Sequence, residues 1–135
     1  MATFTVTTLA DSGPGSLRAA ITSANAASPG SLNTINFSVS GTITLLSDLP
    51  SITHPTAIIA ASSAPGNPPT VGIDFNHHAG LVFASGSQGS QLIGLSLGNA
   101  TGNGVTLNAG NIILNNNYIG LALDGTALGD RKSVV

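Results

Sequence analysis

The chain has 135 residues, no cysteine, 6% charged residues and a formal net charge of -2. The absence of cysteine excludes disulfides, thiolate metal sites and a thiol nucleophile. With 3 Lys and Arg in all, the chain lacks the basic surface that nucleic acids and anionic membranes require. It has no apolar run near the roughly 18 residues of a membrane span and no basic-then-apolar leader, so we expect neither membrane insertion nor a signal peptide.

The first predicted elements are a strand over residues 3–8 and a short helix at about 14–26. The strand is expected because threonine alternates with other residues there, and the helix because small and aliphatic residues recur at i, i+3, i+4 and i+7. Ser12 or Ser16 can cap the first helical turn. The core-facing residues of this helix are predicted to be Leu17, Ala20, Ile21 and Ala24.

After the helix, the sequence consists of short apolar clusters with a period of two, separated by Gly and Asn turns. Similar residues recur at a nearly constant spacing, in one series from Ile35 to Ile58, Val82 and Val105, and in another from Ile73 to Leu95 and Ile119. Such a period predicts an all-β solenoid with one coil per period. A β-sandwich or jelly roll is the alternative, although tighter hairpins would then be expected.

Three stretches resemble a known family: TFTVTTLADSGPGSLRAAITSANA, TINFSVSGTITLLSDLPSIT and NIILNNNYIGLALDGTALG. They are similar to the N-terminal end of bacterial right-handed parallel β-helix repeat proteins of the pectate-lyase-like superfamily, in which a DSGPGSLR helix caps the first coil. The resemblance implies a right-handed parallel β-helix of about four coils with a short N-terminal capping α-helix. It also implies a module of a larger, adhesin-like chain that is extracellular or at the cell surface.

We expect a single domain, with an N-terminal strand and capping helix at 1–33, coils at 34–127 and a tail at 128–135. The tail, Asp130–Val135, is charged and unpatterned. It departs from the repeat pattern of the family that the rest of the chain resembles.

The sequence offers few groups for catalysis. A polysaccharide lyase needs cationic groups, yet neither Lys nor Arg lies between residues 19 and 130. A glycoside hydrolase needs two carboxylates on either side of the scissile bond. Asp74 and Asp124 are the candidate pair, but the sequence predicts a strand end at Asp74 and a turn at Asp124. We therefore predict a non-catalytic protein, with a carbohydrate-binding or hydrolase-like protein that uses these two aspartates as the alternative.

His77 and His78 form the one cluster of metal-ligand residue types. Adjacent residues of a strand face opposite sides, so at most one of them could share a face with another ligand, and we predict a solvated loop without metal or cofactor. Glycan binding is a further hypothesis, since Thr3, Thr5 and Thr7 resemble the hydroxyl rows of some solenoids. Equivalent positions further along are apolar, however, which argues against a regular row.

The C-terminal end of the predicted stack is expected to mediate self-association. No helical periodicity follows the last apolar clusters, so an open strand edge is expected there, and open edges attract other edges. The simplest outcome is a twofold homodimer. In the alternative, residues 124–135 fold across this end and the chain is a monomer. The predicted interface residues are Ile119, Leu121 and Leu123.

Overall fold

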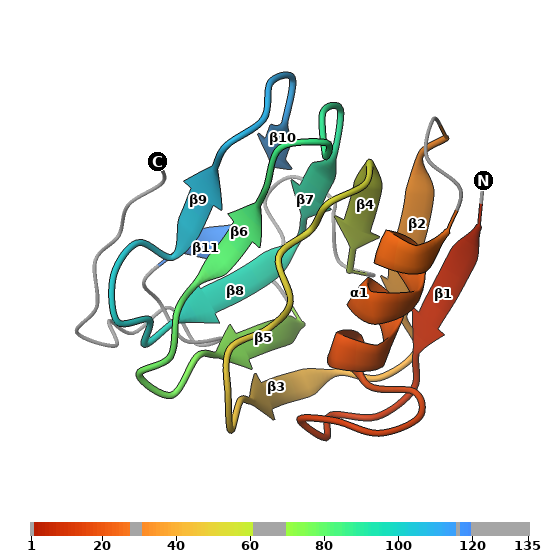
Figure 1. Cartoon of the computed structure of the whole chain (residues 1–135). Coiled ribbons are helices and arrows are strands. Elements are labelled where there is room, and N and C mark those ends of the chain that lie inside the picture. Colours follow the sequence, from red (N-terminus) through yellow and green to blue (C-terminus); the bar gives the residue numbers. More distant parts are fainter. Residues whose placement is uncertain (1, 28–30, 61–69, 116, 120–135) are drawn as a thin grey trace.

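A computed structural model describes residues 2–27, 31–60, 70–115 and 117–119 of the chain. In these residues the fold is mostly β with one short helix (Figure 1). The elements in chain order are β1 (Thr3–Val6), α1 (Leu17–Ala26), β2 (Asn33–Phe37), β3 (Gly41–Thr44), β4 (Thr56–Ile59), β5 (Val71–Asp74), β6 (Leu81–Phe83), β7 (Gln91–Ile93), β8 (Leu95–Gly98), β9 (Val105–Leu107), β10 (Ile113–Asn115) and β11 (Tyr118–Ile119).

The named strands form three sheets, and every pairing among them is parallel. The largest sheet has 5 strands in the order β1-β2-β4-β7-β10. A second sheet has 4 strands in the order β11-β8-β5-β3, and β6 pairs with β9 in a third. An isolated bridge from Ile52 to Phe83 adds to the third sheet. Within the described residues, β1 and β10 are thus the two edges of the largest sheet.

A single apolar core joins the three sheets and the helix. Alternation along β2 shows how the sequence builds it, since Asn33, Ile35 and Phe37 are buried and the residues between them are not. Burial of a large aliphatic or aromatic side chain stabilises the fold by about 1.5–3 kcal/mol. The largest fully buried side chains include Phe75, Phe83, Leu17, Ile21, Ile35, Ile43, Leu45 and Leu92.

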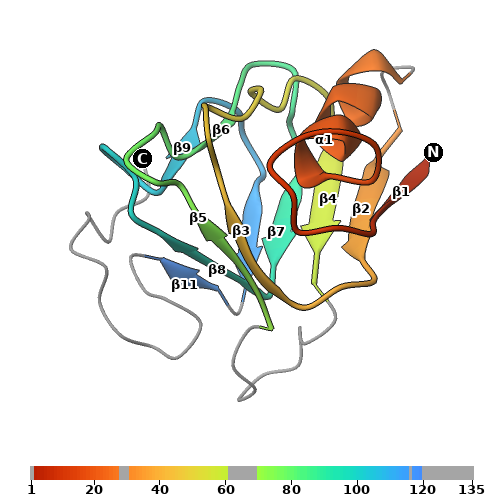
Figure 2. The same ribbon diagram turned by 90° about the horizontal axis from the view of Figure 1, so that it is seen from below.

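Helix α1 begins at Leu17, later than the predicted start at about residue 14. The Ser16 hydroxyl caps it by accepting a hydrogen bond from the amide of Ala19, at 3.1 Å. The helix packs against β1 and β2, on the side of the molecule away from β8 and β11 (Figure 2). Its buried residues are Leu17, Ala20, Ile21 and Ala24.

The predicted right-handed parallel β-helix of about four coils over residues 34–127 is wrong. In a regular stack, every coil contributes one strand to each sheet, and paired strands are separated by a constant number of residues. The described residues instead form three sheets with different numbers of strands. The spacing between partners also varies, because Ile58 is much further along the chain from its partner Leu92 than from its other partner, Ile35. The described residues therefore form a mostly β fold of three parallel sheets with one short helix.

The predicted register fails at two further places. Val82, expected beside Ile58, lies instead in the third sheet opposite Thr106. Ile73, expected beside Leu95, is paired with Leu97. The shift from Leu95 to Leu97 is two residues, and a two-residue shift leaves the same side chains facing the core. The apolar pattern therefore does not distinguish these two registers.

Candidate functional site

The C-terminal edge of the largest sheet carries an exposed apolar side chain. Ile113, in β10, is 51% exposed, and its one counterpart among large exposed apolar residues of the described chain is Leu46, at 72%. Ile113 lies on an edge strand, whereas Leu46 follows the end of β3. Ile113 therefore combines an apolar surface with an adjacent strand edge.

Alternate residues of β10 direct their backbone N–H and C=O groups toward the neighbouring strand, β7. The amide of Ile113 donates to the carbonyl of Ser90, at 3.0 Å, and the carbonyl of Asn115 accepts from the amide of Gly94, at 3.1 Å. In a parallel ladder, the intervening residue directs its N–H and C=O to the other side. The N–H and C=O of Leu114 thus point away from β7, where no described strand pairs with them.

The opposite edge of this sheet lies beside α1. A groove of about 300 Å³ runs between β1 and the helix, lined by strand residues that include Thr3, Phe4 and Thr5 and by helix residues that include Ala19 and Ser23. Both threonines and Ser23 are exposed. None of the residues that line this groove is charged.

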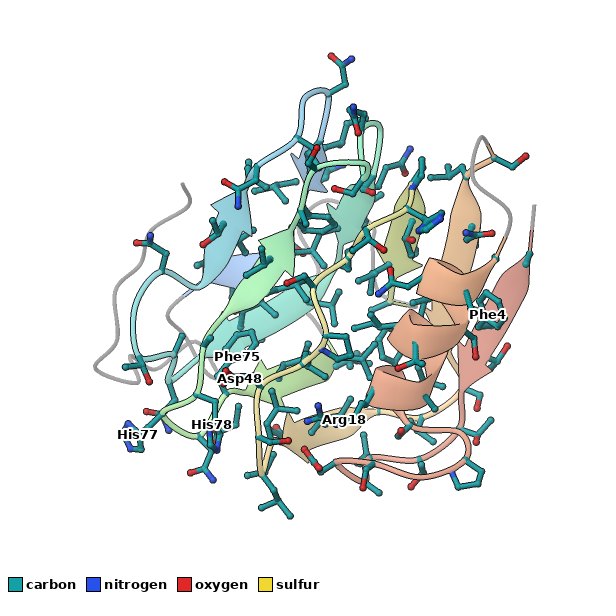
Figure 3. The ribbon with its side chains drawn as sticks, viewed as in Figure 1. Phe4, Arg18, Asp48, Phe75, His77 and His78 are labelled. Carbon is teal, nitrogen blue, oxygen red and sulfur yellow. The ribbon has the colours of Figure 1, made fainter. Side chains whose placement is uncertain are left out.

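A larger polar hollow, of about 470 Å³, lies where the turn after β5 meets the turn after β8. Asp48, His77, His78 and Thr101 are among its lining residues. Nδ1 of His78 lies 3.7 Å from Oδ1 of Asp48, on neighbouring loops (Figure 3). That distance is too long for a direct hydrogen bond between the two side chains.

The turn that carries both histidines is held by backbone contacts. His77 has a positive φ of 65°, a conformation uncommon outside glycine. Its amide donates to the carbonyl of Asn99, at 2.8 Å, and its carbonyl accepts from the Thr101 hydroxyl. The Thr101 hydroxyl is therefore bonded to the backbone rather than to an imidazole, so it does not form with His77 or His78 the nucleophile–base pair that covalent catalysis needs.

Arg18 joins α1 to the loops beside the hollow. Its Nη2 lies 2.9 Å from Oδ1 of Asp11 and 3.0 Å from the carbonyl of Ser47, and Nη1 donates to the carbonyl of Asp48. The amide of Leu46 also donates to Oδ1 of Asp11, at 2.8 Å. This amide and the guanidinium hold the pKa of Asp11 below its usual range, although burial opposes them.

Of the two aspartates of the hydrolase alternative, only Asp74 lies within the described residues. Oδ1 of Asp74 accepts from the amide of Asn76, at 2.8 Å, and from Nδ2 of Asn99, at 3.0 Å. Asp74 thus fastens two turns to each other. Asp124 lies outside the described residues, as does the predicted tail at 128–135.

The other predicted residues have the following positions. The residues 2–27, 31–60, 70–115 and 117–119 contain no group of three or more His, Cys, Asp and Glu that could hold a metal ion. His77 and His78 line the polar hollow instead. Of the predicted interface, Ile119 is partly buried against the core, and Leu121 and Leu123 lie outside the described residues.

Two features were not identified from the sequence. Ile113 stands in the same apolar cluster as its neighbours, and only the strand pairing shows which of them is exposed. Arg18 is the single Lys or Arg before residue 131. A lone cation in such a neutral sequence is the signal that could have indicated the contacts with Asp11 and the loop after β3.

No protein-family model matches this chain, and no curated protein matches it. No helix in the described part of the chain is both long and apolar enough to cross a membrane.

Proposed function

We propose that this chain is a non-catalytic structural or adhesin-like module that self-associates through its β10 edge, most simply as a twofold homodimer. The observation that carries the proposal is the exposed Ile113 on an edge strand. Beside it, the N–H and C=O of Leu114 point away from the sheet and have no partner among the described residues. Both features favour pairing with another strand.

A twofold axis at this edge would place β10 of one copy antiparallel to β10 of its partner. Each Leu114 would then donate to and accept from the other copy, and the two Ile113 side chains would lose solvent contact. Such an interface is self-complementary and closed, so it gives a dimer rather than a fibre. Ile119 and, by the sequence prediction, Leu121 and Leu123 belong to this same end of the chain.

We also propose that the parent protein is extracellular or at the cell surface. The support for this location is the resemblance of the opening DSGPGSLR segment to exported repeat proteins. The low content of charged residues, 6%, agrees with a protein whose polar surface consists mainly of hydroxyl and amide groups.

Native mass spectrometry over a dilution series in the micromolar range tests self-association. We expect a wild-type dimer, and a monomer for Ile113→Lys, because a lysine on an edge strand opposes pairing. The matched control is Leu46→Lys, which places the same charge at the other exposed apolar residue of the described chain and leaves the dimer intact. A wild-type chain that is monomeric at every concentration would contradict the proposal.

A further inference from the structure

We propose that the groove between β1 and α1 binds an uncharged, extended peptide segment, which adds to the sheet as a strand beside β1. The outer side of β1 is a row of backbone groups at strand spacing. Ala2 and Val6 accept hydrogen bonds from β2 and the residue after it, at 2.8 and 2.9 Å. By the alternation of a parallel ladder, the N–H and C=O of Thr3 and Thr5 face away from β2.

The chain itself occupies the next position on this side of β1. The amide of Thr7 donates to the carbonyl of Gly15, at 2.9 Å. Gly15 also lines the groove, so its carbonyl stands where the carbonyl of an added strand would continue the row. Thr3 and Thr5 have no such partner among the described residues. The vacant positions therefore fit a peptide backbone, which supplies alternating donors and acceptors.

The walls of the groove define which peptide fits. The helix presents Ala19 and Ser23, small residues one turn apart that leave room beside the strand, and Phe4 offers apolar contact. A charged side chain entering this groove would lose hydration without gaining an opposite charge, because none of the lining residues is charged. The best partner is therefore a segment of small, uncharged residues in extended conformation.

The probe is a fluorescein-labelled panel of capped hexapeptides built from Thr, Val, Ser and Ala, with binding followed by fluorescence polarisation. We expect members of the panel to bind the full chain, and Ser23→Phe to weaken binding at least about tenfold because the ring fills the groove. Thr22→Phe is the matched control, since Thr22 is an exposed helix residue that does not line the groove. We expect Thr22→Phe to change the peptide affinity by less than about twofold relative to the wild type.

Two backbone readouts separate strand addition from surface adsorption. Thr5→Pro removes the outward amide and weakens binding about tenfold, as expected for the loss of one or two hydrogen bonds, whereas Thr5→Val keeps the amide and the affinity. Bound peptide also slows amide hydrogen exchange at Thr3 and Thr5. Circular dichroism of each variant shows that it is folded.

Three results would overturn this inference: no hexapeptide binds, binding is unaffected by Ser23→Phe, or the amides of Thr3 and Thr5 exchange at the same rate with and without peptide. Loss of a wild-type oligomer in Ser23→Phe would show that a second copy fills the groove, and would overturn it as well. The β10 dimer is tested separately by Ile113→Lys, so either proposal can fail without the other.

Discussion

Arg18 and Asp11 form an ion pair, with 2.9 Å between Nη2 and Oδ1, that ties α1 to the loop before it. The same guanidinium donates to the carbonyls of Ser47 and Asp48 in the segment after β3. Arg18 therefore fixes the position of the helix relative to two loops (Figure 3). The side chains of the pair are 19% and 13% exposed, so water screens them only in part.

Replacement of Arg18 by methionine tests this anchor. Arg18→Met keeps an apolar stem but removes every donor, so the carbonyls of Ser47 and Asp48 lose a partner. We expect the free energy of unfolding to fall by about 1–2 kcal/mol, measured by urea denaturation. Arg18→Lys should recover only part of the loss because an ammonium group lacks the planar fork. Equal stability of Arg18→Met and the wild type would show that the anchor contributes nothing.

Because the pKa of Asp11 is lowered in the folded chain, we expect the stability of the fold to depend on pH. Its pKa is lower in the folded chain than its usual value, first because of the amide of Leu46 and then because of Arg18, so its contribution is present at neutral pH. That contribution is lost as the pH falls below about 4, through the lowered pKa of the folded state. Urea midpoints between pH 7 and pH 3 should fall less steeply for Asp11→Asn than for the wild type. Parallel curves would contradict this assignment.

A third prediction concerns the hydrogen bonds by which Ser16 caps α1. The Ser16 hydroxyl accepts from the Ala19 amide and donates to the carbonyl of Gly13, at 2.8 Å. Ser16→Ala should lower the free energy of unfolding by about 1 kcal/mol. Ser12→Ala, at an exposed position before the helix, is the control and should leave the urea midpoint unchanged. A larger loss for Ser12→Ala would mean that the cap has been assigned to the wrong serine.

A fourth prediction concerns two turns that approach each other closely beside the polar hollow. A Cβ added at Gly80 would lie 2.2 Å from the carbonyl oxygen of Asn103 and 2.5 Å from that of Gly104, so the backbone must move. Gly80→Ala should destabilise the fold by about 1–3 kcal/mol. Gly102→Ala is the matched control, because nothing lies within 4 Å of its added Cβ. If both variants have the same thermal unfolding temperature, the two turns are not in contact.

Part of this fold could be predicted from the sequence because it depends on local pattern. The spacing of Leu17, Ala20, Ile21 and Ala24 defines one face of a helix, and these are the residues that α1 buries. Most of the apolar clusters likewise coincide with strands. These features need only the chain near each residue.

Strand pairing could not be predicted in the same way, because it depends on the lengths of the connections. The connection from Ile58 to its partner Leu92 is longer than the assumed period, so the assumption of a constant period assigned Val82 to the wrong sheet. The shift of Ile73 from Leu95 to Leu97 leaves its side chain on the same face, and no apolar pattern reports it. For the same reason, the exposure of Ile113 became visible only with the pairing of β10.

Amide hydrogen exchange at Leu114, followed as a function of protein concentration, measures self-association through β10 at the strand edge itself. We predict that exchange at this outward-facing amide slows as the dimer forms, while the outward amide of Thr5, on the opposite edge of the same sheet, exchanges at a constant rate. If exchange at Leu114 is independent of protein concentration, the chain does not associate through β10.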